Sequence, residues 1–391
     1  MKKILYGTTA LIAVSMVAGS ASAADKIKLG LGGYWRAAVA VGDSDNDAPS
    51  GSALATDNRS HGFGQESEIY FSGKTTLDNG VKFGVMVQLE GETSGDQMDN
   101  SYIWTAGSFG RLEYGETWGP SLMMSAGTIG EKLSSHGDFA SHFPIGTGAP
   151  NGLGINSYGG GAGLTSTPEA KAVYYTPRMG GFQVGLGYMP ENGAANARGA
   201  ALQSKLASAG ASEIVDLGAN YTGKFGGSSV KLYGNYFTSD SEKTAIGAVA
   251  PQDKDGYSLG AHVGFSGFRV GGKYTKIEDT GAGAAGLLAA GSPGTDRVNW
   301  RVGADYSTGP WGVGVTYQKA NQEILVGGVK STRDDETKYL SVAGTYNLGP
   351  GIQLYGGMQF WDFQDSANIA GASPATEGDN TIGVFGTKLS F

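Results

Sequence analysis

The feature that most constrains this chain is an alternation of apolar with small or polar residues that recurs along most of its length. Between residues 311 and 318, Trp311, Val313, Val315 and Tyr317 alternate with glycine, threonine and glutamine. Successive side chains of a β-strand point to opposite faces of the sheet, so a period of two predicts a strand with one apolar face. The same pattern recurs near residues 182–188, 257–265, 298–306 and 352–360.

The connections between these segments alternate in length. Short turn-forming separators, such as Asn79-Gly80 and Ser266-Gly267, take turns with long loops rich in Ala, Gly, Asp and Ser. We count sixteen strands, near residues 26–42, 65–78, 81–92, 98–107, 110–118, 170–178, 181–190, 213–225, 228–239, 255–266, 268–278, 296–308, 311–322, 336–348, 351–363 and 380–391.

This organisation predicts an all-β fold, a 16-stranded antiparallel transmembrane β-barrel. Strands of about ten residues, with short turns at one end and long loops at the other, are typical of outer-membrane barrels. At sixteen strands the side chains cannot fill the interior, which therefore holds an aqueous channel. A soluble β-sandwich, propeller or solenoid would also have half-apolar strands, but the regular exchange of short and long connections disfavours these alternatives.

Composition supports the strand prediction. Gly accounts for 68 of the 391 residues, and in a helix each would cost roughly 1 kcal/mol relative to Ala. Collagen is excluded because there is no Gly-X-Y period. The formal net charge of −8 disfavours a nucleic-acid partner, and the absence of cysteine excludes disulfides and thiolate metal sites.

The first residues predict a signal for export. Lys2 and Lys3 precede an apolar stretch at 10–17, and Ala21-Ser22-Ala23 is an A-x-A cleavage site. We therefore expect a signal peptide at 1–23 and a single barrel domain at 24–391. An uncleaved membrane anchor is disfavoured because the apolar stretch is too short to span a bilayer.

The chain resembles the trimeric general-diffusion porins of Gram-negative bacteria, in particular the alphaproteobacterial type. The features that carry this resemblance are the opening segment from Ile27 to Tyr34, the hairpin from Gly107 to Gly115, and the terminal Lys388-Leu389-Ser390-Phe391. The resemblance implies a water-filled channel in the outer membrane for passive diffusion of small hydrophilic solutes and ions. It also implies a homotrimer among outer-membrane lipids and lipopolysaccharide, and a terminal Phe391 that the outer-membrane insertion machinery recognises.

In that family the loop after the fifth strand folds into the pore, and here this constriction loop spans 119–169. Charged residues on the non-lipid strand faces are expected to line the pore, because Arg or Lys facing the bilayer midplane costs about 2–4 kcal/mol. The predicted pore constriction has Arg36, Arg111, Arg297, Arg301 and Lys231 on its basic side, and Glu131, Asp138 and Glu113 on its acidic side. Such opposed charges screen solutes at close quarters.

The sequence indicates other functional sites less strongly. Acidic outer loops favour a weak preference for cations. Asp43-x-Asp45-x-Asp47 fails the EF-hand pattern, which leaves a loosely bound loop cation such as Ca²⁺ as an alternative to a solvated acidic loop, and no other cofactor is expected. The cluster from His136 to His142 matches no specific metal site. No nucleophile motif indicates an enzyme. A structural or adhesive barrel and a substrate-selective, sugar-type channel remain the alternative functions.

Overall fold

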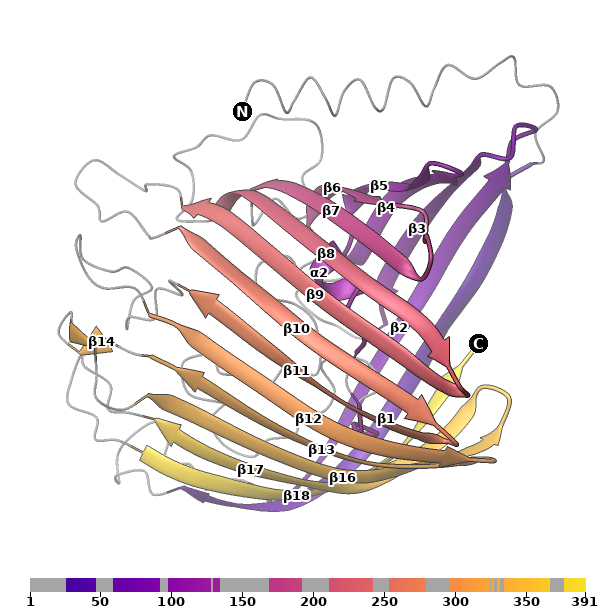
Figure 1. Ribbon diagram of the computed structural model, residues 1–391. Helices are drawn as coiled ribbons and strands as arrows, with labels where there is room; N and C mark the ends of the chain where they lie inside the picture. Colours follow the sequence, from indigo (N-terminus) through magenta and orange to yellow (C-terminus); the bar gives the residue numbers. More distant parts are fainter. Residues whose placement is uncertain are drawn as a thin grey trace.

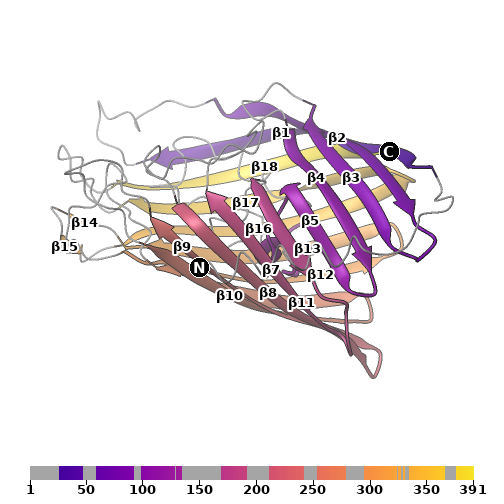
Figure 2. The ribbon, with the colours of Figure 1, turned by 90° about the horizontal axis from the view of Figure 1, so that it is seen from above.

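The computed structural model describes residues 26–46, 59–91, 98–127, 129–133, 169–191, 211–241, 253–278, 295–323, 325–326, 329–330, 334–365 and 376–391. Within these ranges, sixteen strands close into a barrel, as predicted (Figure 1). Each barrel strand pairs antiparallel with the barrel strands before and after it, and the last pairs with the first. Figure 2 shows the strands wrapped around one common interior.

The barrel strands are β1 (Lys28–Asn46), β2 (His61–Thr76), β3 (Lys82–Glu90), β4 (Met98–Gly107), β5 (Gly110–Glu116), β6 (Ala170–Tyr175), β7 (Phe182–Glu191), β8 (Ala211–Phe225), β9 (Ser228–Ser241), β10 (Lys254–Phe265), β11 (Phe268–Glu278), β12 (Arg297–Thr308), β13 (Trp311–Gln322), β16 (Asp335–Gly349), β17 (Ile352–Asp365) and β18 (Thr376–Ser390). A small hairpin that the sequence did not predict, β14 (Leu325–Val326) and β15 (Val329–Lys330), lies between β13 and β16.

The predicted strand positions agree closely with these bounds, and the main differences lie at the long-loop end. There β1 continues to Asn46, β2 begins at His61 and β18 begins at Thr376, each further into the loops than expected. The apolar alternation stops before these residues, but main-chain pairing does not depend on side-chain polarity. The pairs Asp45–Asp379 and Asn46–Gly378 therefore extend the sheet beyond its apolar part.

The two ends of the chain's sheet meet at the short-turn end. The Gly33 and Phe391 main chains exchange two hydrogen bonds, from Gly33 N to Phe391 O (3.1 Å) and from Phe391 N to Gly33 O (3.1 Å). The last residue thus completes the seam between β1 and β18. Gly33 has a φ of 157°, and a Cβ there would overlap the carbonyl oxygen of Glu68 on β2. This close approach explains why glycine occupies the seam.

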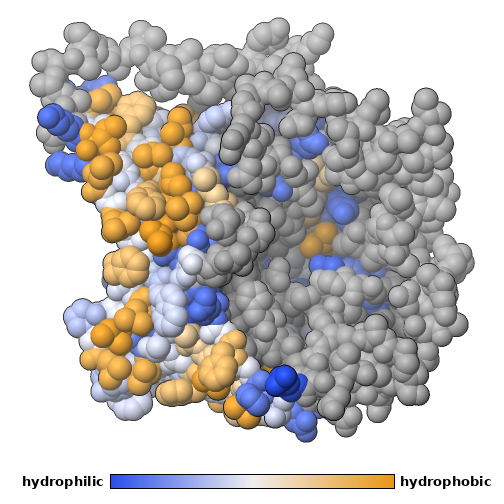
Figure 3. Space-filling model, turned by 180° about the vertical axis from the view of Figure 1, so that it is seen from behind, coloured by the Kyte–Doolittle hydropathy of each residue, from blue (hydrophilic) through white to orange (hydrophobic). Residues whose placement is uncertain are grey.

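The barrel is inverted relative to a soluble protein. Large apolar side chains are exposed on its outer face, for example Ile103 (60%), Leu259 (57%) and Val313 (53%), whereas Gln318 and Gln359 on the inner face are fully buried. Figure 3 shows apolar residues spread over the described part of the outside. No helix that is long and apolar enough to span a membrane occurs among the described residues.

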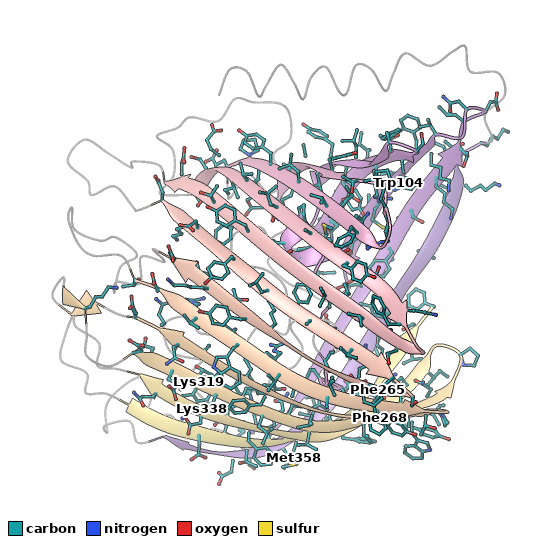
Figure 4. All side chains as sticks on the ribbon, in the orientation of Figure 1. Trp104, Phe265, Phe268, Lys319, Lys338 and Met358 are labelled. Atoms are coloured by element: carbon teal, nitrogen blue, oxygen red, sulfur yellow. The ribbon has the colours of Figure 1, made fainter. Side chains whose placement is uncertain are left out.

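The outer apolar band ends in polar groups at the long-loop end. Lys319 and Lys338 lie there on the outer face, while Phe265 and Phe268 lie towards the short-turn end (Figure 4). Glu336 binds both lysines, at 2.6 Å from Lys319 Nζ and 2.8 Å from Lys338 Nζ. This order of apolar and charged residues fits a sheet that crosses a membrane and emerges into water.

Candidate functional site

The connection between β5 and β6 enters the barrel. Its described part comprises residues 117–127, 129–133 and 169, and we call residues 117–127 and 129–133 the inserted segment. It contains helix α2 (Pro120–Met123), which packs against β7, β8 and β9. In Figure 1, α2 lies behind β8 and β9. Residues 134–168 of the predicted constriction loop, including Asp138 and the cluster from His136 to His142, lie outside the described residues, as do the predicted signal peptide and Asp47.

The barrel wall holds the main chain of the inserted segment. Six inner-face side chains bind its backbone atoms, with donor–acceptor distances between 2.6 and 3.2 Å: Lys171 to Thr117 O, Asp216 to Ser121 N, Asn235 to Ser121 O, Asn220 to Met124 O, Lys231 to Ser125 O and Asp305 to Gly130 N. These partners come from β6, β8, β9 and β12. The segment therefore follows the wall instead of crossing the open interior.

Glycines in the wall make room for this path. On β7 and β8, a Cβ at Gly185 would lie 2.7 Å from Met124 Sδ, and one at Gly218 would lie 2.9 Å from Pro120 O. On β12 and β13, a Cβ at Gly303 or Gly314 would overlap the carbonyl oxygens of the inserted segment. A side chain at any of these positions would displace the segment, so these wall glycines form its seat.

The far end of the inserted segment is fixed by a buried carboxylate and an apolar contact. Glu131 is 8% exposed, and its carboxylate accepts hydrogen bonds from Tyr339 Oη (2.7 Å), Ser341 Oγ (3.2 Å) and Leu133 N (3.1 Å). Leu133, 2% exposed, packs into an apolar cluster inside the barrel. The other members of the cluster come from β1, β16, β17 and β18: Ala38, Ala40, Tyr339, Ala343, Tyr355, Trp361, Ile382 and Val384.

Two of the predicted constriction residues lie against the inserted segment. Lys231 Nζ donates to Ser125 O (2.6 Å), and Arg301, 7% exposed, donates from Nε to Gln318 Oε1 (2.6 Å) and interacts electrostatically with Glu131. Arg297 lies further towards the long-loop end and donates to Gln322 Oε1 (2.9 Å). Sequence phase places all three on the inner face correctly, but only the path of the inserted segment shows that Lys231 and Arg301 pack against it.

Apart from one hydrogen bond at its start, from Thr117 Oγ1 to Glu113 Oε2 (2.9 Å), the inserted segment, as far as it is described, leaves the wall of β2, β3, β4 and β5 uncovered. It carries five inward carboxylates, of which the sequence analysis placed only Glu113 in the constriction: Glu66, Glu68, Glu90, Asp99 and Glu113. The carboxylates of Glu68, Glu90 and Asp99 approach within 4.8 Å of one another. No ion-binding role follows from this proximity alone.

A hydrogen-bond network fixes these carboxylates. Tyr34 Oη lies 2.6 Å from Glu66 Oε1 and 2.8 Å from Glu68 Oε1. Gln88 Nε2 donates to Glu68 Oε2 (2.5 Å) and to Asp99 Oδ2 (3.1 Å). The negative charges therefore occupy defined positions on the wall instead of moving with flexible side chains.

The predicted Arg36 and Arg111 lie beside these acids. Arg36, on the adjoining strand β1, is 1% exposed and forms an ion pair with Glu66 of the wall. Arg111 Nε lies 2.5 Å from Glu113 Oε1, and its guanidinium stacks 4.3 Å from the centre of the Trp104 ring. The structure thus groups Arg36, Arg111 and Glu113 at the uncovered wall, and Lys231, Arg301 and Glu131 at the inserted segment.

The long-loop end of the barrel also carries carboxylates. Burial, together with the charges of Glu323, Asp335 and Glu336, raises the pKa of Asp334, which lies between β15 and β16. Asp43 and Asp45 of the predicted calcium motif lie in β1. An acidic mouth concentrates cations before they enter the interior.

Comparison with known proteins shows which proteins this chain is similar to. A model of the Gram-negative porin family matches residues 7–366. Outer membrane porin protein 32 of Delftia acidovorans is 25% identical over 380 residues, which cover 92% of this chain and 91% of that protein. Two solved structures share the fold: the anion-selective porin from Comamonas acidovorans (TM-score 0.61, 17% identity, covering 94% of this chain and 100% of that one) and the trimer form of OmpT from Vibrio cholerae (TM-score 0.59, 14% identity, covering 94% and 100%).

Proposed function

Because the chain belongs to the Gram-negative porin family, we propose that its ion preference is set where the inserted segment leaves the wall of β2–β5 uncovered. The protein is an outer-membrane porin, a water-filled channel through which small hydrophilic solutes cross by passive diffusion. This is a family of channels, in agreement with the expectation that the chain is not an enzyme.

The observation that carries the proposal is the division of the inner wall. Beyond Thr117, which donates to Glu113 on β5, the inserted segment is bonded to β6, β8, β9, β12 and β16, and Leu133 reaches the apolar cluster of β16–β18 and β1. The passage for solutes therefore runs between this segment and the wall of β2–β5. Charges on that wall act over short distances in a narrow channel, where salt screens them poorly.

That wall favours cations. Its five carboxylates, Glu66, Glu68, Glu90, Asp99 and Glu113, outnumber its three inward cations, Lys74, Lys82 and Arg111. A fixed excess of negative charge raises the local concentration of cations. The Comamonas acidovorans structure is named anion-selective, but at 17% identity that structure gives no information about the charges of this wall.

The experiment is to reconstitute the protein into a planar bilayer and measure the reversal potential across a gradient of KCl. We expect ohmic conductance and a potential of the sign that cation preference gives. Asp99→Asn keeps the side-chain shape and removes one wall charge, so it should shift the potential towards anion preference. Asp362→Asn removes an equivalent charge from the outer face, where Asp362 is 3.3 Å from Lys338 Nζ, and should leave the potential unchanged.

The outcomes separate the parts of the proposal. An anion-directed potential in the wild type would contradict the cation preference while leaving the channel function in place. A folded protein that does not conduct would point to the structural or adhesive alternative. Block that saturates with one sugar would favour the substrate-selective alternative.

We further propose that the protein is a homotrimer whose contact face includes β2–β5, surrounded elsewhere by lipid and lipopolysaccharide. The outward positions of these strands include Gln65, Ser101 and Thr105, polar side chains that hydrocarbon would leave without partners. The trimer form of the Vibrio cholerae structure gives a precedent within the fold. Conductance steps in groups of three and a trimer mass after mild extraction are the expected results, and a monomeric mass with single steps would contradict the proposal.

We also propose that Phe391 serves as the signal for the outer-membrane insertion machinery. Phe391 is 68% exposed, although its main chain is bonded into the β1–β18 seam. Its side chain therefore contributes little to the packing of the finished barrel.

A further inference from the structure

The carboxylate of Asp305, on β12, joins the barrel wall to the inserted segment. From the wall, Arg269 on the neighbouring strand donates twice, from Nε to Asp305 Oδ1 (3.0 Å) and from Nη2 to Asp305 Oδ2 (2.8 Å). From the inserted segment, Gly130 N donates to Asp305 Oδ2 (3.2 Å) and Lys132 Nζ lies 3.5 Å from Asp305 Oδ1. The Asp305 side chain is 1% exposed.

The contacts on the two sides of this carboxylate depend on different parts of the structure. Arg269 and Asp305 are direct partners in the pairing of β11 with β12, so they would meet without any inserted segment. The contacts with Gly130 and Lys132 exist only because residues 129–133 lie against β12 and β13. Gly303 and Gly314 allow this approach, since a Cβ on either would overlap the segment's carbonyl oxygens.

Charge makes the carboxylate necessary at this point. Arg269 and Lys132 both point at it, so without its negative charge two cations would face each other across the contact. Like charges at such distances repel, and a buried donor that loses its acceptor carries a desolvation cost. Removing the charge therefore turns an attraction between wall and inserted segment into a repulsion.

We propose that Asp305 is the positioning residue that seats the inserted segment against β11–β13 and thereby fixes the width of the passage. This inference rests on the proposed function, in which the inserted segment narrows the passage. Asp305 acts through Gly130 and Lys132, and it has no direct role in contacting solutes.

The test uses the full-length protein in planar bilayers, with single-channel conductance and the size of the largest polyethylene glycol that enters the channel as readouts. Asp305→Asn should lower the conductance by about 1.5-fold or more and admit only smaller polymers, because the segment moves off β12 and β13 into the passage. Arg269→Gln removes only the wall partner and keeps both loop donors, so its conductance should stay near that of the wild type. Asp362→Asn, a carboxylate change on the outer face, is the matched control.

Each outcome supports or overturns the role of Asp305. Equal changes in Asp305→Asn and Arg269→Gln, or a conductance and polymer size unchanged in Asp305→Asn, would overturn the inference. If Asp305→Asn does not assemble, Lys132→Met leaves the wall pair intact and should still lower the conductance, and an unchanged value there would also overturn the inference. A wild type that does not conduct would instead count against the proposed function.

Discussion

Replacing Gly314 with alanine should narrow the channel without weakening the barrel. Gly314 lies on the inner face of β13, directly beneath the inserted segment. A Cβ at this position would overlap Gly130 O and lie 2.9 Å from both the carbonyl carbon and the Cα of Gly130. Ordinary van der Waals contact begins at 3.4 Å, so the Gly130 main chain has to move by at least 3.4 − 2.9 = 0.5 Å, and further to relieve the overlap at oxygen.

This clash destabilises the contact between the inserted segment and the barrel wall. Both sides of the contact are main chain, which cannot move aside as a side chain does. Overpacking a close contact costs about 1–3 kcal/mol. That corresponds to a change of about 5- to 150-fold in the ratio of seated to displaced segments. In the strand itself, alanine is better tolerated than glycine by roughly 0.5–1 kcal/mol, so the barrel gains slightly.

The substitution should destabilise the seating of the inserted segment and slightly stabilise the barrel, so the assay measures both. Gly314→Ala should decrease single-channel conductance and increase its noise, while the temperature at which the folded barrel denatures in detergent stays the same or rises. Gly62→Ala is the matched control, because Gly62 lies on the inner face of β2 and a Cβ added there would have no atom within 4 Å. If both variants conduct like the wild type, the inserted segment is not held by this contact and the reasoning fails.

Three further perturbations test other parts of the structure. Tyr339→Phe leaves the buried carboxylate of Glu131 without one donor, a loss of about 1–3 kcal/mol, and should increase channel noise in single-channel recordings. Leu259→Arg, at a side chain 57% exposed on the outer face, should lower the free energy of folding into lipid bilayers by about 2–4 kcal/mol, and a smaller loss would indicate that β10 does not face lipid. Deleting Phe391 removes the two main-chain bonds to Gly33 and the proposed insertion signal, so the folded fraction recovered from outer membranes should fall, whereas normal recovery would contradict both roles.

The strands could be predicted from sequence because their cause is local. A strand between lipid and water must alternate, and Trp311–Gln318 shows this as clearly in the sequence as in the barrel. The prediction shortened β1, β2 and β18 where their side chains turn polar, since the main-chain pairing that extends them leaves no mark on a single strand. The terminal seam at Gly33 and Phe391 likewise depends on residues far apart in the chain.

The site was predicted less completely because its cause is not local. Strand phase assigns Arg301 and Lys231 to the inner face, but it cannot tell a side chain that lines the passage from one that packs against the inserted segment. The acids Glu68 and Asp99 were not placed in the constriction. A signal was present in the inward glycines Gly303 and Gly314, whose missing side chains mark where another part of the chain passes.

Width and charge are controlled by different parts of this channel. The wall holds the inserted segment mainly through main-chain atoms, as in the bonds of Asp216 to Ser121 N and Asp305 to Gly130 N, so the seat does not depend on the charges of the uncovered wall. Gly314→Ala should therefore change the size limit without changing the ion preference, and Asp99→Asn should shift the ion preference without changing the size limit. Distant, independent changes combine additively, within roughly 0.3–0.5 kcal/mol. The double variant Gly314→Ala with Asp99→Asn should show both effects at their single-variant size, and a smaller shift in reversal potential would show that the seated segment also strengthens the field at Asp99.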